Sequence, residues 1–415
     1  MNGLLLVAGA AWAPRASLND FILFLLIVGV IWALVLAVWR FFDLKRRGFS
    51  LHPGVLMWRT SKGLGFIDNA AARFKRGFIR FGTFAAVVGF ALMVFVTFNI
   101  ALNALIVYTR SSIALPGVKF VLPGILPGLS LPVWLVVIGI VLIVHEFCHG
   151  FLLRAQGLKT KSVGLLLFLF IPGGFVEPDE KELARTTPLK RIRMFAAGPV
   201  SNVLISLVFF ALLLVFIVPK PGVYVYGVAE NYPLENYAEN LLGARILAVN
   251  GVPVDSLEEY RAVMENTVPG ENAELITDEG EFVVTLAKAP DDNHGVFGIY
   301  PASARSRTYF LNPLVMLYMA LSVVLTGGFF TPVLYNSLIP WWGIGLLQWL
   351  YTLNLGVGLF NLLPAKPLDG GYMLEAALER RVGRARASCV VKWTSYLVLI
   401  LLILNIIPGV VRMVR

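Results

Sequence analysis

The segment VLIVHEFCHGFLL contains the residues with the clearest chemical potential in the sequence. It holds the pattern H-E-x-x-H, formed by His145, Glu146 and His149. At about 100° per residue, two histidines four positions apart leave a helix from nearly the same side, so both imidazoles can bind one zinc ion. Glu146 stands beside them and can take a proton from an attacking water without being a ligand itself. The pattern therefore predicts a zinc hydrolase site.

The helix that carries this pattern is apolar, which makes its acidic residue informative. A charged side chain within a membrane-spanning helix costs roughly 2.5–3.5 kcal/mol, so a Glu146 without a function would be unusual there. A buried contact between histidine and glutamate is the alternative interpretation. Cys148 projects about 100° away from His149 and is expected to be a small packing residue, not a ligand.

A third zinc ligand must come from elsewhere, because a catalytic zinc usually has three protein ligands and one open position. Neither His52 nor His294 lies in a segment that fits this role easily. Between Asn293 and Leu374 the only acidic residue is Asp369, in FNLLPAKPLDGGYMLE. Its prolines and glycines break the helix, and a broken backbone at membrane depth is tolerated only inside protein or beside a watery cavity. Asp369 is therefore the leading candidate, with an amino-terminal cap for a helix near Tyr372 as the alternative.

Composition indicates a membrane protein. Of the 415 residues, 58% are hydrophobic and 14% are charged, against about 45–50% apolar residues in ordinary soluble domains. This excludes disorder, a coiled coil and a single soluble enzyme domain. Apolar stretches long enough to cross a ~30 Å hydrocarbon core are expected at about 21–39, 82–108, 131–155, 195–218, 341–363 and 388–408.

Basic residues orient these spans. Segment 40–80 holds ten basic and two acidic residues, and segments 154–193 and 380–386 are also basic, so all three are expected in the cytosol. The amino terminus, expected to be retained, then lies outside. The net charge of +10 reflects this topology and no nucleic-acid partner is expected. The loop 40–80 is expected to touch anionic headgroups of the lipid bilayer.

Residues 219–300 have the composition of a separate module, with four basic and fourteen acidic residues, which places them outside. Short strands, an Asn-Gly turn at Asn250 and a helical SLEEYRAVMEN follow one another. The order ARILAVNGVPVDSLEEY resembles a PDZ domain, although Ala244 stands where such domains usually have aspartate. Any other small extracellular β-rich domain is the alternative.

Four motifs in order, HEFCHG, GGFVEPDE, AAGPVSN and NLLPAKPLDGG, resemble the site-2 protease family of intramembrane zinc metalloproteases over residues 131–408. The resemblance implies His145, His149 and Asp369 as Zn²⁺ ligands and Glu146 as catalytic base. It also implies cleavage of transmembrane protein substrates within or beside their membrane segments. A PDZ insertion at this place is common in the family and implies a filter for ectodomains or a docking groove for a peptide. Lys366 departs from the pattern, since the family often makes this linker more apolar.

The segment Gly173, Gly174, Phe175 and Val176 resembles the re-entrant hairpin of this family. A helical substrate hides its carbonyls in its own hydrogen bonds, and an exposed strand edge near the zinc can pair with the segment once it is unwound. A plain cytosolic turn is the alternative.

Two amides are expected at membrane depth. Asn202 follows Pro199 by three residues, and Asn361 precedes Pro364. Either can donate to the oxyanion of a tetrahedral intermediate, and either can instead form a hydrogen bond between helices.

The predicted fold is an all-α polytopic membrane protein of about six transmembrane helices with re-entrant elements and an inserted small α+β PDZ-like domain. We expect amino-terminal transmembrane helices and a basic cytosolic loop in 1–130, core helices with the H-E-x-x-H motif in 131–218, the PDZ-like domain in 219–300, an apolar interfacial or re-entrant segment in 301–340, and the aspartate ligand with the last transmembrane helix in 341–415.

Segment 309–335 is long and apolar, yet a crossing there would put Asp369 on the side opposite His145. It is therefore expected to dip into the membrane and return, or to lie along the outer interface, turning at Gly327-Gly328 and Pro332.

The sequence thus predicts an intramembrane zinc protease of the cell membrane, with its active site toward the cytosolic side. One alternative is a membrane zinc protease of another class that uses a glutamate such as Glu375 as third ligand. The other is a membrane scaffold without enzymatic activity that displays a PDZ module. The helix-breaking PLDGG favours Asp369 over Glu375, and the intact Glu146 argues against a scaffold.

Overall fold

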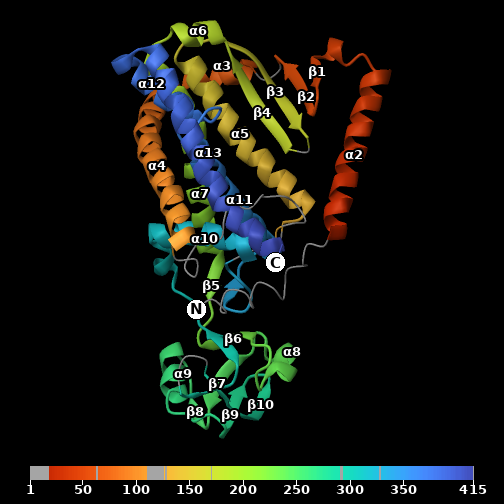
Figure 1. Ribbon diagram of the computed structural model, residues 1–415, viewed down its shortest axis with the longest axis vertical. Helices are drawn as coiled ribbons and strands as arrows, with labels where there is room; N and C mark the ends of the chain where they lie inside the picture. Colours follow the sequence, from red (N-terminus) through yellow and green to blue (C-terminus); the bar gives the residue numbers. More distant parts are fainter. Residues whose placement is uncertain are drawn as a thin grey trace. The chain divides into compact units, whose positions relative to one another are not determined.

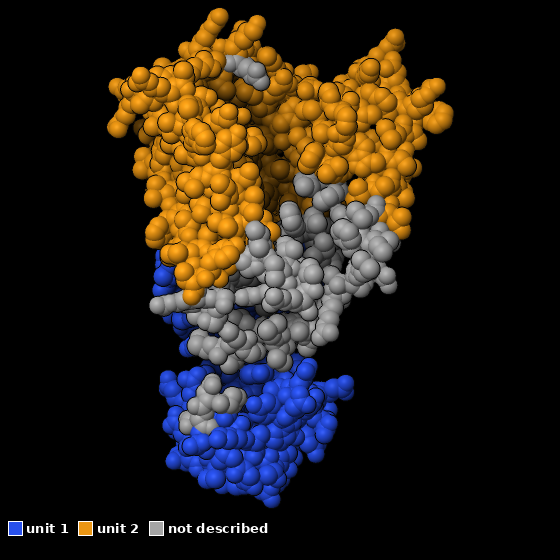
Figure 2. Space-filling view, in the orientation of Figure 1, with its two compact units in different colours: residues 1–15, 125–129, 209–349 blue, residues 16–124, 130–208, 350–415 orange. Residues whose placement is uncertain are grey.

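The computed structural model describes residues 18–61, 64–109, 126, 129–169, 171–289, 293–326 and 329–414. The expectation of a retained amino terminus falls on residues outside this part. The chain forms two compact units (Figure 2): unit 1 comprises residues 1–15, 125–129 and 209–349, and unit 2 comprises residues 16–124, 130–208 and 350–415. Every residue proposed from the sequence as a ligand, base or oxyanion donor belongs to unit 2.

Five helices in the described residues are long and apolar enough to span a membrane. They are α4 (Lys75–Thr109), α5 (Leu131–Ala155), α7 (Pro188–Phe216), α11 (Trp341–Asn361) and α13 (Arg384–Val414). The shortest, α11, has 21 residues and rises about 31 Å, enough for the hydrocarbon core. The prediction of a multi-pass membrane protein is thereby confirmed.

The sixth expected span, 21–39, falls within α2 (Leu18–Phe41). Among the residues whose side chains the structure describes, this helix contributes the shorter apolar stretch Leu26–Phe41. A sixth crossing therefore stays a prediction.

Unit 2 also contains an antiparallel sheet in the order β1-β2-β3-β4 (Figure 1). Its strands are β1 (Phe49–His52), β2 (Val55–Thr60), β3 (Thr160–Phe168) and β4 (Ile171–Pro178). Strand β4 lies at the edge of the sheet beside α5, and it contains the segment expected from the sequence to pair with substrate. The β1-β2 hairpin was not expected, because the basic segment 40–80 was interpreted as a solvated loop.

Short helices connect these elements: η1 (Lys45–Arg47), α3 (Leu64–Arg73), α6 (Glu180–Arg185) and α12 (Asp369–Val382). Asp179 follows the last residue of β4 and caps α6, accepting hydrogen bonds from the backbone N–H groups of Lys181 at 3.0 Å and Glu182 at 3.2 Å. The N–H of Glu182 lowers the pKa of this carboxyl because it stabilises the charged form. The motif GGFVEPDE is thus an edge strand followed by a helix start.

Small side chains bring α4, α7 and α12 close together. Ala85 of α4, Ala196 of α7 and Met373 of α12 are fully buried in one apolar cluster. Farther along α4, Asn103 donates to Asn405 of α13 at 2.6 Å, the kind of interhelical amide contact that holds membrane helices together. Helices α4 and α13 therefore pack against each other and against α12.

Unit 1 contains a compact α+β module within residues 219–302. Its sheet has the order β10-β9-β7-β6-β13, with β8 paired to β7. Its elements are β6 (Val223–Val228), η2 (Glu235–Tyr237), α8 (Ala238–Leu241), β7 (Arg245–Val249), β8 (Val252–Pro253), α9 (Leu257–Met264), β9 (Asn272–Thr277), β10 (Gly280–Thr285), β11 (Ala287–Lys288), β12 (Gly295–Val296) and β13 (Ile299–Ala302). Asn250 and Gly251 form the expected turn between β7 and β8, both with positive φ. The assignment to the PDZ domains stays a prediction.

The ambiguous segment 309–335 forms η3 (Arg307–Leu311) and α10 (Pro313–Thr326), followed by β14 (Tyr335–Ser337). Helix α10 has 14 residues and rises about 21 Å, less than the hydrocarbon core. Both ends of the segment meet Ile217: Arg307 donates to its carbonyl at 2.6 Å, and Ser337 pairs with it where β14 joins β5 (Ile217–Pro219). This geometry supports a segment that leaves and returns to the same place.

Thiol labelling tests this path. Single cysteines at Ser306 and Ser337, in a background without Cys148 and Cys389, should both react with an impermeant thiol reagent from outside, since both positions lie near Ile217. Labelling of only one of them before the membrane is opened would mean that the segment crosses, and this topology would be wrong.

Candidate active site

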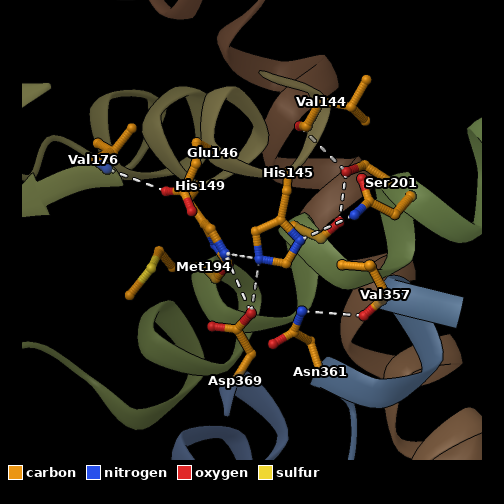
Figure 3. A network of polar contacts seen from close by, with 12 residues as sticks. Val144, His145, Glu146, His149, Val176, Met194, Ser201, Val357, Asn361 and Asp369 are labelled. Carbon is orange, nitrogen blue, oxygen red and sulfur yellow. Dashed lines mark hydrogen bonds and ion pairs between the residues drawn. The ribbon is translucent and has the colours of Figure 1, made fainter. Parts of the chain in front are cut away.

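Helix α5 presents His145 and His149 toward Asp369, the first residue of α12 (Figure 3). The Nε2 atoms of the two histidines are 3.1 Å apart. The Oδ2 atom of Asp369 lies 3.1 Å from Nε2 of His145 and 3.4 Å from Nε2 of His149. Among the described residues these three form the group that can hold a metal ion. The fold thus brings together His145 and Asp369, which are 224 positions apart in the sequence.

The spacing of these atoms suits zinc. Ligand atoms bound to a tetrahedral zinc at about 2.0–2.2 Å lie about 3.3–3.5 Å from one another. The three observed distances, 3.1, 3.1 and 3.4 Å, are close to this value. Two imidazoles and a carboxylate are also a donor set that catalytic zinc sites use.

Helix α7 leaves room for an ion because it has a glycine at the point of contact. A Cβ atom on Gly198 would lie 2.4 Å from Nε2 of His149 and 2.9 Å from Nε2 of His145. Any side chain at position 198 would therefore occupy the space that a metal ion between the two histidines needs. The glycine of AAGPVSN therefore has a steric function that its position in the sequence does not reveal.

The outward nitrogens of both histidines also meet α7. Nδ1 of His149 lies 2.7 Å from the backbone carbonyl of Met194, and Nδ1 of His145 lies 3.3 Å from the side-chain amide of Asn202. Metal-binding histidines usually donate their second N–H to such a partner. Asn202 is completely buried, and its Oδ1 has no hydrogen-bond partner among the described residues. Rotating the amide by half a turn places this oxygen where it accepts from His145.

Glu146 lies beside the histidines but is directed toward the sheet. Its Oε2 accepts a hydrogen bond from the backbone N–H of Val176 in β4 at 3.1 Å (Figure 3). The carboxylate is therefore held next to the metal-ligand group by a strand and is not a member of it. This arrangement matches the division expected from H-E-x-x-H, in which the glutamate is not a ligand.

Asp369 is positioned by the two glycines that follow it. A Cβ on Gly370 would lie 2.3 Å from the carbonyl oxygen of Leu362, and one on Gly371 would lie 2.5 Å from the carbonyl carbon of Ala365. Only glycine permits α12 to start this close to the end of α11. Burial by itself would raise the pKa of Asp369, which lies outside the five apolar spans, but His149 and His145 hold that pKa well below its usual range.

A cavity of about 580 Å³ in unit 2 gives access to these residues. Two basic residues of its lining form ion pairs: Lys366 binds Glu375, which also lines the cavity, at 2.5 Å, and Arg191 binds Glu379. Glu375 is thus engaged by Lys366 and is not part of the metal-ligand group. The polar lining is suited to water.

Asn361 lies beside Asp369 in the same cavity (Figure 3). Its Nδ2 donates to the carbonyl of Val357 in its own helix at 3.1 Å. Cys148 is not a member of the metal-ligand group. The structure therefore brings His145, Glu146, His149, Asn202, Asn361 and Asp369 together with Val176 of β4.

A family model described as Peptidase family M50 matches residues 133–405. The chain belongs to peptidase family M50. An uncharacterized protein of Methanocaldococcus jannaschii is 26% identical over 362 residues, which cover 85% of this chain and 84% of that protein. The zinc metalloprotease RasP of Geobacillus kaustophilus is 25% identical over 240 residues, covering 50% of this chain and 55% of RasP.

Membership in M50 confirms the resemblance to the site-2 protease family that the four motifs indicated. It also confirms zinc as the metal, because RasP is named as a zinc metalloprotease and the site offers a suitable group of ligands. The chain is therefore a membrane-embedded M50 metalloprotease by family.

A methyl group at Gly198 should remove the metal without unfolding the protein. In Gly198→Ala the new Cβ pushes the two imidazoles apart. Loss of a hydrogen-bond partner behind a metal ligand lowers metal affinity about 10–100-fold. Zinc affinity should fall by more than this in Gly198→Ala, because the change acts on the ion's own space. Metal analysis of the purified variant measures this. Gly356→Ala on α11, where no atom lies within 4 Å of a Cβ, is the matched control and should keep its zinc. Full occupancy in Gly198→Ala would contradict the assigned metal position.

Proposed function

We propose that this M50 protein is an intramembrane zinc endopeptidase that hydrolyses peptide bonds within or next to transmembrane segments of membrane proteins. One observation carries the proposal. Glu146 and two of the three residues of the metal-ligand group, His145 and His149, lie on α5, a 25-residue apolar helix that is long enough to span the membrane. A hydrolytic site on such a helix is more accessible to peptide segments within the membrane than to soluble peptides.

We propose that His145, His149 and Asp369 hold the zinc and that Glu146 is the general base. When bound, zinc supplies Lewis-acid chemistry: it polarises the peptide carbonyl and makes water a better nucleophile near neutral pH. Glu146 accepts the proton of the attacking water and delivers it to the leaving amine. The N–H of Val176 holds one carboxylate oxygen of Glu146 during both transfers.

The open edge of β4 is the proposed place for the substrate backbone. Backbone N–H groups alternate between the two sides of a strand, so the N–H of Gly174 faces the same way as that of Val176. A substrate segment that adds to this edge as a fifth strand is no longer helical, so its carbonyls are free of helical hydrogen bonds. It also lies next to Glu146, which binds Val176 of the same edge.

The two buried amides receive different proposed roles. Asn202 contacts His145, and we assign it to the orientation of that imidazole, not to the oxyanion. Asn361 lines the cavity beside Asp369, and the hydrogen bond of its amide goes to Val357 of its own helix. It is the remaining candidate to donate to the oxyanion.

We further propose the orientation that the charges predict. The amino terminus and the acidic module 219–300 lie outside the cell membrane, and the active site opens toward the cytosolic side. The module, as a PDZ-like domain, restricts large ectodomains or binds a peptide. The cavity with its two ion pairs is the water path to the cytosolic side.

Both alternative functions lose support. A protease that uses Glu375 as third ligand would require this carboxylate to leave Lys366, 2.5 Å away. A scaffold without activity has no need for three ligands within metal distance or for a glycine that leaves their ion space.

Metal binding and turnover should separate by residue. His145→Ala, His149→Ala and Asp369→Asn should each lose zinc and activity together, whereas Glu146→Gln should keep zinc and lose turnover by at least about 10²-fold. The measurements are metal content and the appearance of membrane-protein fragments in cells that carry each variant. Zinc retained in Asp369→Asn but lost in Glu375→Gln would overturn the ligand assignment. Fragments produced equally by Glu146→Gln would overturn the proposed function.

The role of Asn202 can be read from the zinc dissociation constant. Asn202→Leu removes the acceptor for His145 and should weaken zinc binding about 10–100-fold. Ser206→Ala, a change at another fully buried polar residue of α7, is the control and should leave the constant unchanged. If Asn202→Leu binds zinc normally and loses only kcat, the oxyanion role belongs to Asn202 instead.

A further inference from the structure

Three residues of β4 show which way its backbone groups point. Pro172 and Pro178 have no N–H, and prolines occur within sheets where the missing N–H would face away from the neighbouring strand. Val176 donates its N–H to Glu146 at 3.1 Å instead of to β3 (Figure 3). The three residues are separated by even numbers of positions. They therefore direct their backbone groups to the same side of β4, the side away from β3.

The residue just after β4 supports this alternation. Asp179 donates its N–H in the opposite direction, to the carbonyl of Lys159 next to the start of β3, at 3.1 Å. Gly174 is two positions from both Pro172 and Val176, so its N–H and its carbonyl also point away from β3. The free edge of the four-stranded sheet is thus formed by the backbone of every second residue of β4.

This edge is poor in donors and rich in acceptors. Pro172 and Pro178 lack an N–H, and the N–H of Val176 is taken by Glu146. Within β4, which the structure describes from Ile171 to Pro178, Gly174 therefore has the one N–H that an added strand can use. The carbonyls of all four residues point to the edge. An ordinary edge offers a donor and an acceptor at every second residue, so a partner of β4 must pair chiefly through its own N–H groups.

The edge reaches the metal-ligand group at one end. Val176 and Pro178 line the cavity of about 580 Å³ that contains this group, and Pro172 and Gly174 are not among its lining residues. A residue of an added strand opposite Val176 would therefore lie at the border of that cavity, beside Glu146. A residue opposite Gly174 or Pro172 would lie farther from the metal-ligand group.

We propose that the shortage of donors on β4 fixes the register of the substrate, so that the peptide bond after the substrate residue opposite Val176 is cut. The inference rests on the proposed function, in which the substrate adds to the edge of β4. Neighbouring strands of this sheet are antiparallel, and the substrate continues this pattern. The substrate residue opposite Gly174 is then the second residue after the cut, and the one opposite Pro172 is the fourth.

The register leaves the carbonyl of the cut bond without a partner on β4. A substrate carbonyl opposite Gly174 accepts the N–H of Gly174, whereas the carbonyl opposite Val176 finds that N–H bound to Glu146. The carbonyl opposite Pro172 also lacks a donor, but it lies away from the metal-ligand group. Hydrolysis at the first of these unpaired carbonyls breaks its C–N bond: water supplies the hydroxyl of the new carboxyl group, and Glu146 passes the remaining proton to the new amine.

The same register determines which substrate N–H groups are needed. The residue before the cut and the second and fourth residues after it donate to the carbonyls of Val176, Gly174 and Pro172. The N–H of the third residue after the cut points away from β4, because direction alternates along a strand. Proline has no N–H. It should therefore be excluded from the first three positions and tolerated at the last.

A cleavage profile of the full-length enzyme tests this pattern. Purified protein in lipid nanodiscs is incubated with a peptide library made by trypsin digestion of a bacterial membrane fraction, and new ends are identified by mass spectrometry. Cuts made by wild-type enzyme and absent with Glu146→Gln define the profile. One peptide that is cut is then synthesised with a single N-methyl group at each position in turn. An N-methyl group removes one N–H and leaves the side chain and the carbonyl unchanged.

The effect of N-methylation should alternate. Loss of one hydrogen bond is worth about 2–10-fold, and the methyl group also holds the strands apart, so kcat/KM should fall at least about tenfold when the group is on the residue before the cut or on the second or fourth residue after it. On the third residue after the cut, the same group should leave kcat/KM nearly unchanged. This position is the matched control within the peptide.

A change in the enzyme tests the shortage of donors itself. Pro172→Ala adds an N–H to the edge, which can donate to the substrate carbonyl opposite it, so KM for the unmodified peptide should fall about 2–10-fold with kcat unchanged. Pro188→Ala also adds an N–H, but at the first residue of α7, where this group has no helical partner. It is the control and should leave KM unchanged.

The outcomes are distinct. Equal effects of N-methylation at the second and third residues after the cut, or an alternation confined to the residues before the cut, would overturn the inference. A folded Pro172→Ala enzyme with the wild-type KM would also overturn it. If thermal melting shows that Pro172→Ala does not fold, the N-methyl series, measured with wild-type enzyme, decides alone. No cuts by wild-type enzyme beyond those with Glu146→Gln would mean that the proposed function itself has failed.

Discussion

The close approach of α7 to α5 at Gly198 is the contact on which the rest of the site depends. Two imidazoles one helical turn apart can share an ion only if nothing fills the space in front of their Nε2 atoms. A Cβ on Gly198 would stand 2.4 and 2.9 Å from those atoms. The same helix provides the carbonyl of Met194 and the amide of Asn202 behind the rings. Helix α7 therefore determines the space for the proposed metal ion and the orientation of two of its proposed ligands.

A second constraint acts from α12. Gly370 and Gly371 let this helix start against the backbone that follows α11, which brings Asp369 within 3.1 Å of His145. Glu146 is constrained from a third direction, by the N–H of Val176 at the sheet edge. The proposed metal ligands, the proposed base and the proposed substrate strand are thus held by different elements of one unit. A change in the sheet can alter Glu146 without disturbing the ligands.

Residue types and spacing in the sequence were sufficient to predict the three residues that the structure brings within metal distance of one another. H-E-x-x-H depends only on helical geometry, and Asp369 was the one acidic residue in a long apolar stretch. The functions of Gly198 and Asn202 were not visible there, since a glycine and an amide in a helix acquire these roles only when another helix packs against them.

The β1-β2 hairpin was missed for another reason. The ten basic residues of segment 40–80 dominated its interpretation, although Pro53-Gly54 between the apolar runs FSLH and VLMWRT was a turn signal.

The most direct test of this account is X-ray absorption at the zinc edge of the purified enzyme. Two imidazole nitrogens and a carboxylate oxygen at about 2.0–2.2 Å are predicted, with no sulfur in the first shell. In Asp369→Asn, any residual zinc should lack the carboxylate contribution. A sulfur scatterer at about 2.3 Å, which would mean that Cys148 binds the metal, or a first shell without imidazole, would contradict the site derived from α5, α7 and α12.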